Sequence, residues 1–285
     1  MPQAPAEPVT RYDIDSLDNR DPEVIGRFAA RVLPLMRAYF RPEIRGLERI
    51  PDGPALYVGN HNGGASWDSY TFFGEVHERR GIEHVPYGLG HELTISLPVI
   101  HQMVVPLGAI RASHENARRV FARGAKLLVY PGSDYDAFRA YRDRNRVIFG
   151  PRRGYIRLAL REQVPIIPVV SAGAHQVIYV LDDGQWLARA LRLDKLLRSK
   201  AWPIALSFPL GLTVFPPFLH VPWPSKFFQE ALEPIHLEPT GPEAAEDPAH
   251  VERCHDRVLR TMQRAMDRLA AERRARRGRR HPTQG

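Results

Sequence analysis

The stretch ALYVGNHNGGASWDSY, residues 55–70, carries the pattern that decides the fold of this chain. The short apolar run from Ala55 to Val58 predicts a buried strand, which leads into Gly59, Asn60 and His61. In open α/β folds, ligands bind beyond the carboxyl ends of the strands. A strand that ends at a histidine therefore predicts an imidazole at a place that is suited to chemistry.

The same stretch holds a possible partner for this histidine. His61 and Asp68 are seven residues apart, and on one continuous helix about 10 Å along the axis would separate them. A hydrogen bond between them needs a turn, and Gly63 and Gly64 tolerate positive φ. If the turn closes, Asp68 accepts from Nδ1 of His61, and Nε2 is left to take a proton from an alcohol. The alternative is a histidine that ends a strand and an aspartate in the first turn of a helix.

Length and composition fit a globular protein. With 285 residues, 44% of them hydrophobic, the chain suffices for one large α/β domain or two small ones. The single cysteine, Cys254, excludes an internal disulfide and fits a reducing compartment. The first residues lack the basic start and apolar run of a signal peptide, and no apolar run reaches about 18 residues. We therefore expect a cytoplasmic protein without a standard membrane-spanning helix.

The charge of the chain indicates anionic partners. The formal net charge is +8 and the sequence pI is about 9.9, which fits nucleic acid, a membrane surface or a phosphorylated cofactor. Much of the excess follows Glu272, in Arg273, Arg274, Arg276, Arg277, Arg279 and Arg280. This run is interpreted as a solvated end, with loose attraction to anionic lipid as its active role.

Helical and strand-like patterns alternate along the chain. Compact apolar runs at 85–89, 126–130 and 164–171 predict strands, and the last is typical of a strand that is buried on both faces of a parallel sheet. The alternation predicts the α/β class: a mostly parallel twisted sheet flanked by helices. The polar turns after these strands would converge at one edge of the sheet.

The two ends of the domain are predicted to be helical. Asp21 and Pro22 form a helix start, and apolar residues recur at three- and four-residue steps as far as Tyr39, with a kink expected at Pro34. This amphipathic helix would lie on the domain or on a bilayer. A long final helix begins near His250. We expect residues 1–20 to be flexible, 21–271 to form one domain and 272–285 to be a basic tail.

Two further segments admit a functional interpretation. Residues 202–223 are apolar but hold five prolines, so they form either a buried cover or a surface that dips into lipid, with Trp202 and Trp223 as interfacial anchors. His77, His84 and His91 recur every seven residues, but glycines break a shared helical face and no Cys or acid cluster completes a ligand set. No metal site is predicted.

Four blocks in this order resemble the lysophospholipid acyltransferase superfamily of glycerolipid acyltransferases, and most closely its monoacylglycerol and diacylglycerol acyltransferase-like branch. The blocks span about residues 40–175 and comprise Gly59-Asn60-His61 through Asp68, Gly108-Ala109-Ile110-Arg111, Tyr130-Pro131-Gly132-Ser133 through Asp136, and Val164-Pro165-Ile166-Ile167-Pro168-Val169.

The resemblance implies transfer of a fatty acyl group from an acyl thioester to a hydroxyl of a glycerolipid or lysophospholipid. His61 would be the general base and Asp68 its orienting residue. Four residues usually separate this pair in the superfamily, whereas here six do, and Ser66 stands at the usual spacing. Either side chain therefore remains a candidate to orient His61. Backbone N–H groups near Gly63-Gly64 or Gly132-Ser133 are candidate donors to the oxyanion.

The resemblance also implies binding residues and partners. The third block carries Pro-Gly-Ser with Asp136 three positions later, where the superfamily usually carries Pro-Glu-Gly. Acyl-CoA or an acyl carrier protein would be the donor, with no cofactor beyond this co-substrate. A lipid acceptor and an anionic membrane surface, at the inner face of the membrane, would be partners, and nucleic acid would not. The guanidinium groups of Arg111 and Arg139 match phosphate geometry. The substrate-binding residues would be Gly63, Gly64, Arg111, Pro131, Gly132, Ser133, Asp136 and Arg139.

Two other classes of function compete with this interpretation. A serine-type lipid hydrolase would use Ser66 or Ser133 as its nucleophile, but neither lies in Gly-x-Ser-x-Gly. A non-enzymatic protein that binds membranes or nucleic acid would fit the charge. The chain has no basic helix interleaved with base-stacking aromatic residues, which counts against nucleic acid.

Overall fold

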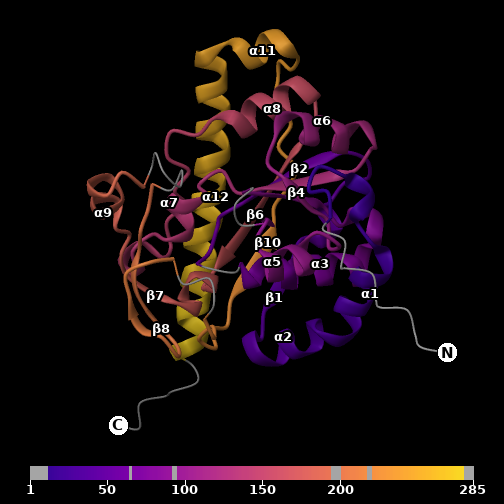
Figure 1. The fold of residues 1–285 in the computed structure, drawn as a ribbon. Coiled ribbons are helices and arrows are strands. Elements are labelled where there is room, and N and C mark those ends of the chain that lie inside the picture. Colours follow the sequence, from indigo (N-terminus) through magenta and orange to yellow (C-terminus); the bar gives the residue numbers. More distant parts are fainter. Residues whose placement is uncertain (1–11, 64–65, 92–94, 194–199, 217–219, 279–285) are drawn as a thin grey trace, which may run out of the picture.

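A seven-stranded sheet forms the centre of the molecule in the computed structural model, which describes residues 12–63, 66–91, 95–193, 200–216 and 220–278 (Figure 1). The strand order is β1-β10-β6-β2-β5-β3-β4, and every neighbouring pair is parallel except β10 with β6. The predicted mostly parallel sheet is therefore confirmed. The strands are β1 (Glu43–Arg45), β2 (Ala55–Gly59), β3 (Tyr87–Gly90), β4 (Ala109–Arg111), β5 (Lys126–Val129), β6 (Ile166–Ala172) and β10 (Phe228–Ala231).

Helices cover both faces of this sheet. Every residue of β2 is buried, because its side chains alternate between two cores. Leu56 and Val58 pack with side chains of α6, α8 and α12, whereas Tyr57 packs with Phe72 and Val76 of α3. The α-helices are α1 (Pro22–Arg31), α2 (Leu33–Phe40), α3 (Trp67–Arg80), α5 (Pro98–Val104), α6 (His114–Ala122), α7 (Asp134–Ala137), α8 (Gly154–Glu162), α9 (Gln185–Ala190), α11 (Pro242–Glu246) and α12 (Pro248–Gly278).

The amino-terminal helix forms as two pieces that pack on α3. The Asp21 carboxylate caps α1 by accepting hydrogen bonds from the N–H groups of Glu23 and Val24. The chain bends at Val32, just before Pro34, and continues as α2.

Residues 12–20, which we expected to be flexible with the rest of the amino terminus, pack against the domain. The N–H of Tyr12 donates to Nε2 of His101 at 2.9 Å, and the Asp15 carboxylate pairs with Arg111 and accepts from Asn116. A short 3-10 helix, Leu17–Asn19, places Leu17 in the core. Residues 1–11 lie outside the described part of the chain.

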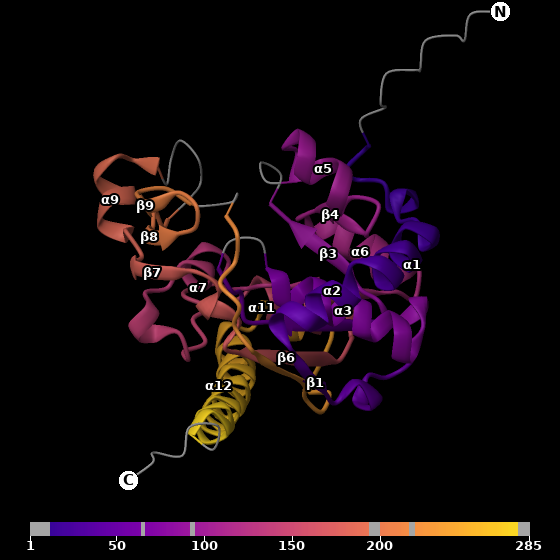
Figure 2. The same ribbon diagram turned by 90° about the horizontal axis from the view of Figure 1, so that it is seen from below.

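A second, smaller sheet stands beside the first (Figure 2). It consists of β7 (Tyr179–Asp182), β8 (Ile204–Ser207) and β9 (Gly211–Thr213), which pair in antiparallel fashion in that order. Its inner side, with Val180 and Ala205, packs in one core with Met36 and Phe40 of α2. The helix that follows β7, α9, ends at Ala190, and residues 194–199 are not described.

The last helix extends beyond the predicted domain boundary at residue 271. Arg45 donates to the Glu272 carboxylate, Arg276 pairs with Glu43, and Arg273 donates to the backbone oxygen of Lys226. The first part of the expected tail is therefore helical and bonded to the domain, and residues 279–285 lie outside the described chain. Among the described helices, none combines the length and the apolar character that crossing a membrane requires.

Candidate active site

Three loops meet at the carboxyl edge of the main sheet. They follow β6, β2 and β5, which are neighbours in that order, so the predicted convergence of polar turns is confirmed. His61 follows β2, Asp136 lies on α7 beyond β5, and the backbone N–H of His61 donates to Oδ2 of Asp136 at 2.6 Å. Asn60 ties β2 to β6, since its Oδ1 accepts from the N–H of Ser171 at 2.8 Å.

Asp136 and Arg139 form a buried ion pair directly behind His61. The side chains are 0% and 1% exposed, and Nη1 of Arg139 lies 3.1 Å from Oδ1 of Asp136. The same carboxylate accepts from the N–H of Ile148 at 3.1 Å. Burial raises the pKa of Asp136 to about 6, while Arg139 and these N–H groups act in the opposite direction, so the carboxylate is ionised at pH 7.

Both Nη atoms of Arg139 donate hydrogen bonds, whereas its buried Nε has no hydrogen-bond partner among the described residues. Its guanidinium donates to the backbone oxygen of His61 at 2.7 Å and to Oδ1 of Asn62 at 2.9 Å. The guanidinium also donates to the backbone oxygen of Arg144. The backbone oxygen of Arg139 in turn accepts from Nε2–H of the buried His175 at 2.8 Å. Predicted as substrate-binding residues, Asp136 and Arg139 instead clamp the main chain of His61 from both of its peptide groups. Their burial leaves no surface for a substrate phosphate.

His61 as a whole residue is only partly buried, in contrast to the clamp behind it. Nδ1 lies 3.1 Å from Oγ of Ser66, and the ring packs on that of Tyr130 with 4.7 Å between the centroids. Burial, together with the charge of Arg139, lowers the pKa of His61 to about 4. The ring is therefore neutral at pH 7 and able to accept a proton.

Asp68 points away from the His61 ring. Its Oδ2 accepts from Nδ2 of Asn62 at 2.8 Å, and burial raises the pKa of this carboxyl to about 6. The expected hydrogen bond between Asp68 and Nδ1 of His61 is replaced by that of Ser66. The reason is local: Ser66 has a left-handed backbone, with φ 50° and ψ 48°, just before α3, and Asp68 is carried into the first turn of that helix.

Comparison with known proteins identifies the family of this site. A family model described as acyltransferase matches residues 41–172. An uncharacterized protein of Mycobacterium tuberculosis is 32% identical over 251 residues, which cover 86% of this chain and 67% of that protein. The chain belongs to the glycerolipid acyltransferase superfamily. It is an O-acyltransferase of the glycerolipid type, and the resemblance carried by the four sequence blocks is confirmed.

More distant relatives of this acyltransferase are also found. A human protein named DGAT1/2-independent enzyme synthesizing storage lipids is 25% identical over 173 residues, 59% of this chain and 52% of that protein. Among solved structures, the 1-acyl-sn-glycerophosphate acyltransferase PlsC of Thermotoga maritima aligns with a TM-score of 0.49 at 16% identity. That alignment covers 86% of this chain and 83% of the PlsC chain.

Arg111 of the acyltransferase lies apart from His61. It ends β4, the edge strand, from which β3 and β5 separate β2. Its Nε donates to the Asp15 carboxylate at 2.8 Å, and its Nη2 contacts the same group. The structure therefore does not bring Arg111 to the site; it uses this arginine to hold residues 12–20 against the sheet.

Two glycines of the site allow close approaches in the loops that follow β2 and β5. A Cβ at Gly132 would lie 2.3 Å from Cβ of Asp136, and a Cβ at Gly63 would lie 2.5 Å from Cγ2 of Ile178. The N–H of Ser133 donates to the backbone oxygen of Tyr130 at 3.0 Å, which uses one of the expected oxyanion donors. Pro131 is buried beside Gly132, and Gly64 lies outside the described residues.

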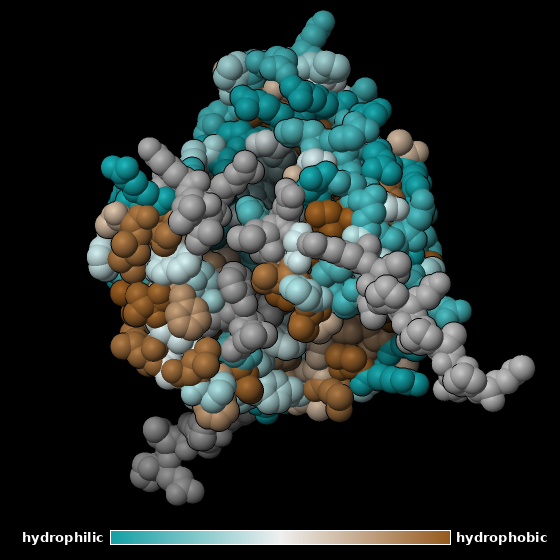
Figure 3. Space-filling model, in the orientation of Figure 1, coloured by the Kyte–Doolittle hydropathy of each residue, from teal (hydrophilic) through white to brown (hydrophobic). Residues whose placement is uncertain are grey.

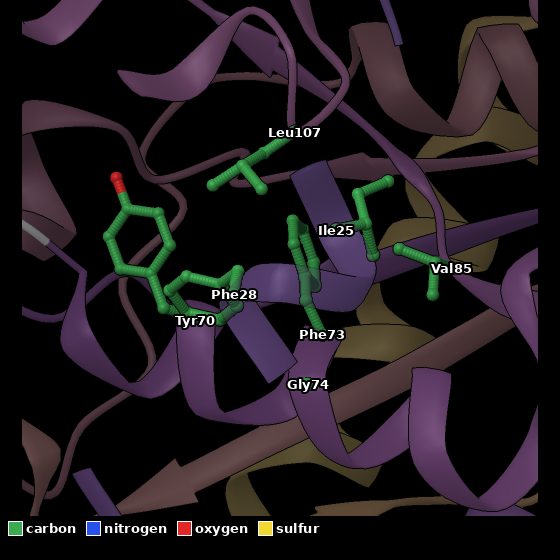
Figure 4. A pocket seen from close by; sticks show the side chains of 7 residues that line it. All are labelled: Ile25, Phe28, Tyr70, Phe73, Gly74, Val85 and Leu107. Carbon is green, nitrogen blue, oxygen red and sulfur yellow. The ribbon is translucent and has the colours of Figure 1, made fainter. Parts of the chain in front are cut away.

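A small apolar pocket lies between α1 and α3 (Figure 4). Tyr70, which lines it, follows Asp68 by two residues on α3, but His61 is not part of its wall. The lining residues are Ile25, Phe28, Tyr70, Phe73, Gly74, Val85 and Leu107.

The sequence interpretation missed four residues that shape the site. Asn62 links Asp68 to Arg139, Tyr130 supports the imidazole face, and His175 holds the backbone of Arg139. The backbone N–H of Ser171, on β6, donates to the side chain of Asn60, which follows β2. Each of these residues lies at or just past the end of β2, β5 or β6, and that shared position is the signal that could have identified them.

The seven-residue histidine series has structural contacts. His84 is buried, with Nε2 3.0 Å from Oδ1 of Asp52, far from the site loops in the sheet. Within the described residues, no group of three or more His, Cys, Asp or Glu side chains is placed to hold a metal ion.

Proposed function

We propose that this acyltransferase moves a fatty acyl group from an acyl thioester to a hydroxyl of a lipid, with His61 as general base. The observation that carries the proposal is the clamp on His61. Both peptide groups of this residue are held by a buried ion pair, while the residue as a whole is only partly buried and its ring is neutral. Such fixation suits a base that must meet a hydroxyl at hydrogen-bond distance.

The steps follow from the atoms at the site. Nδ1 of His61 lies 3.1 Å from Oγ of Ser66, and we assign the proton of this contact to Nδ1, which leaves the lone pair of Nε2 for the acceptor hydroxyl. As Nε2 takes the proton, the hydroxyl oxygen forms a bond to the thioester carbonyl carbon, and an oxyanion develops. The N–H of Gly63 is the proposed donor to this oxyanion. The C–S bond then breaks, and the thiolate leaves with the proton that His61 returns.

We further propose acyl-CoA or an acyl carrier protein as donor, and a lysophospholipid, a monoacylglycerol or a diacylglycerol as acceptor. The name of the human relative supports a neutral-lipid acceptor, since it refers to storage lipids. The net charge of +8 supports work at an anionic membrane surface, which we place at the inner face of the membrane.

A thiol-release assay tests the proposed function. Purified protein is incubated with long-chain acyl-CoA and each acceptor in turn, and free thiol and acylated product are measured together. His61→Ala should lower the rate by roughly 10² to 10⁴, the usual contribution of general-base catalysis. His114→Ala, at the exposed start of α6, is the matched control and should keep the wild-type rate. Undiminished turnover in His61→Ala would remove the proposed base.

A second function has a specific observation in its favour. Oγ of Ser66 lies 3.1 Å from Nδ1 of His61, and this serine has positive φ between a strand and a helix, as the nucleophile of a serine hydrolase does. A hydrolase would release free fatty acid without an acceptor, and Ser66→Ala would abolish its activity. In the acyltransferase, product requires the acceptor, and Ser66→Ala lowers the rate only by roughly 2- to 10-fold, the worth of one hydrogen bond.

A further inference from the structure

In the small sheet, small and polar side chains are buried and large apolar side chains are exposed. In β8 and β9 the buried positions are held by Ala205, Ser207 and Thr213, and the Thr213 hydroxyl is bonded to the backbone oxygen of Ala205. The large apolar side chains alternate with them and face outward. Leu206 and Leu212, which are register partners across β8 and β9, are 42% and 61% exposed. A sheet that needed only to cover a core would have the opposite pattern.

This outward face extends over three strands and their connections. Tyr179 is the partner of Leu206 on β7, so one row of exposed apolar side chains crosses the whole sheet. Twelve of the eighteen exposed large hydrophobic side chains among the described residues belong to this region, here called the outer apolar face: Tyr179, Leu181, Trp186, Leu191, Leu206, Phe208, Leu210, Leu212, Val214, Phe215, Val221 and Trp223. In Figure 3 a brown, hydrophobic area lies at the left, over the part of the molecule where Figure 1 places α9, β7 and β8. Contiguous apolar patches of this kind mark interaction sites.

The charged residues of the outer apolar face indicate which kind of partner binds it. Residues 179–225, which hold the outer apolar face, contain five basic and three acidic residues. Arg189, Arg192 and Lys200 are exposed, whereas Asp182 and Asp183 are partly buried. A second copy of the chain, docked through the same face, would bring these like charges together. An anionic lipid surface complements them, and exposed aromatic residues such as Trp186 and Trp223 are typical of a membrane interface. Trp202, the other expected anchor, is partly buried where it packs against Gly184.

The face is coupled to the catalytic loop. Gly63 packs against Ile178, the residue before β7, and the N–H of Trp223 donates to the backbone oxygen of Val177 at 2.8 Å. A membrane that binds the small sheet would therefore lie near the loop that carries His61. In Figure 2 the small sheet and α5 lie on the same side of the molecule, and α5 exposes Val99 and Met103.

We propose that the outer apolar face docks the protein on the surface of a bilayer that contains anionic lipid. The role of this docking rests on the proposed function, because it delivers a lipid hydroxyl to His61. The residues of the main sheet and of α2 position the catalytic loop, whereas the small sheet selects the surface on which the enzyme works.

Vesicle flotation of the full chain, without any substrate, tests the proposal. Wild-type protein should bind phosphatidylcholine vesicles that contain phosphatidylglycerol more strongly than vesicles of phosphatidylcholine alone. The double variant Leu206→Ser/Leu212→Ser should bind them about tenfold or more weakly, since burying one leucine side chain is worth at least that factor. Leu35→Ser, on α2, removes a leucine that is 70% exposed and should bind like wild type.

Three results would overturn the docking proposal. The first is wild-type vesicle binding by the double variant, and the second is loss of binding in Leu35→Ser. The third is a wild-type dimer that the double variant converts to a monomer while neither binds vesicles. Thermal unfolding and thiol release with a soluble short-chain acceptor show that the variants are folded. If no acceptor gives thiol release but flotation follows the expected order, the proposed function fails and the docking face stands.

Discussion

The two sheets of this protein use the same alternation of side chains in opposite ways. In the main sheet, β2 buries Leu56 on one face and Tyr57 on the other, because helices cover both. In the small sheet, only one face is covered, and the large side chains stand on the uncovered one. The main sheet gains an edge at which hydrogen bonds to both peptide groups fix the main chain of His61. The small sheet gives up burial and keeps an apolar surface available to a partner.

Substitution of Arg139 should have the largest effect on the edge of the main sheet that holds His61. In Arg139→Met the Asp136 carboxylate loses the buried guanidinium that pairs with it, and breaking a buried pair in this way costs about 3–5 kcal/mol of unfolding free energy. Acyl transfer should fall as well, because the backbone oxygen of His61 loses its donor. The destabilisation is measured by denaturant unfolding at pH 7 and pH 5.

The pH dependence separates the charge from the lost packing. Burial already raises the pKa of Asp136 to about 6, and removal of Arg139 raises it further. Protonation at pH 5 then removes the uncompensated charge, so the destabilisation should be smaller there than at pH 7. Arg146→Met is the matched control: its pair with Asp143 is exposed, and such pairs contribute about 0–1 kcal/mol. Equal effects of the two variants would contradict the buried clamp.

One identical substitution in each sheet sharpens the comparison further. Leu56 on β2 is 0% exposed, and Leu56→Ala should lower the unfolding free energy by about 2–5 kcal/mol through lost transfer energy and a cavity. Leu212→Ala on β9 removes a side chain that is mostly in solvent, so the change should stay within about 0.5 kcal/mol. Denaturant midpoints of the two variants give the result. A large effect of Leu212→Ala would mean that the outer face is packed against another part of the chain.

The same contrast explains which elements the sequence predicts. β2, β5 and β6 are continuous apolar runs between polar turns, and such runs report burial on two faces directly. The sequence does not predict β8 and β9, because both strands are short, Pro209 lies between them, and their large side chains point outward. β4 is missed because three residues carry no periodicity.

At the site, the sequence identifies the proposed base, His61, better than the partners of that residue. His61 is marked by its place after a strand, which depends only on local pattern. The partner of Nδ1 depends on the path of the turn, and the left-handed backbone of Ser66 decides it in favour of that serine. Arg139 and Asp136 have the residue types of a phosphate site, and only the packing of α7 shows that they face inward.

The smallest expected effect concerns the two rivals for orienting His61. Ser66→Ala removes the partner of Nδ1, and one hydrogen bond is worth about 0.5–1.5 kcal/mol, so kcat/KM should fall roughly 2- to 10-fold. Asp68→Asn keeps an oxygen that can accept from Asn62 and should cost less. A larger loss in Asp68→Asn would make Asp68 the orienting residue, and complete loss in Ser66→Ala would favour the serine nucleophile.

The pH profile of these variants gives a readout that a purely structural role would not move. Below its pKa His61 is an imidazolium and accepts no proton, and burial and Arg139 lower that pKa to about 4. The acidic limb of kcat/KM should therefore lie below the value of about 6.5 that is usual for histidine. The raised pKa of Asp68, about 6, would produce a limb at higher pH if its ionised form were required. Since Nδ1 is bonded to Ser66 rather than to Asp68, the limb should stay in place in Asp68→Asn and shift in Ser66→Ala.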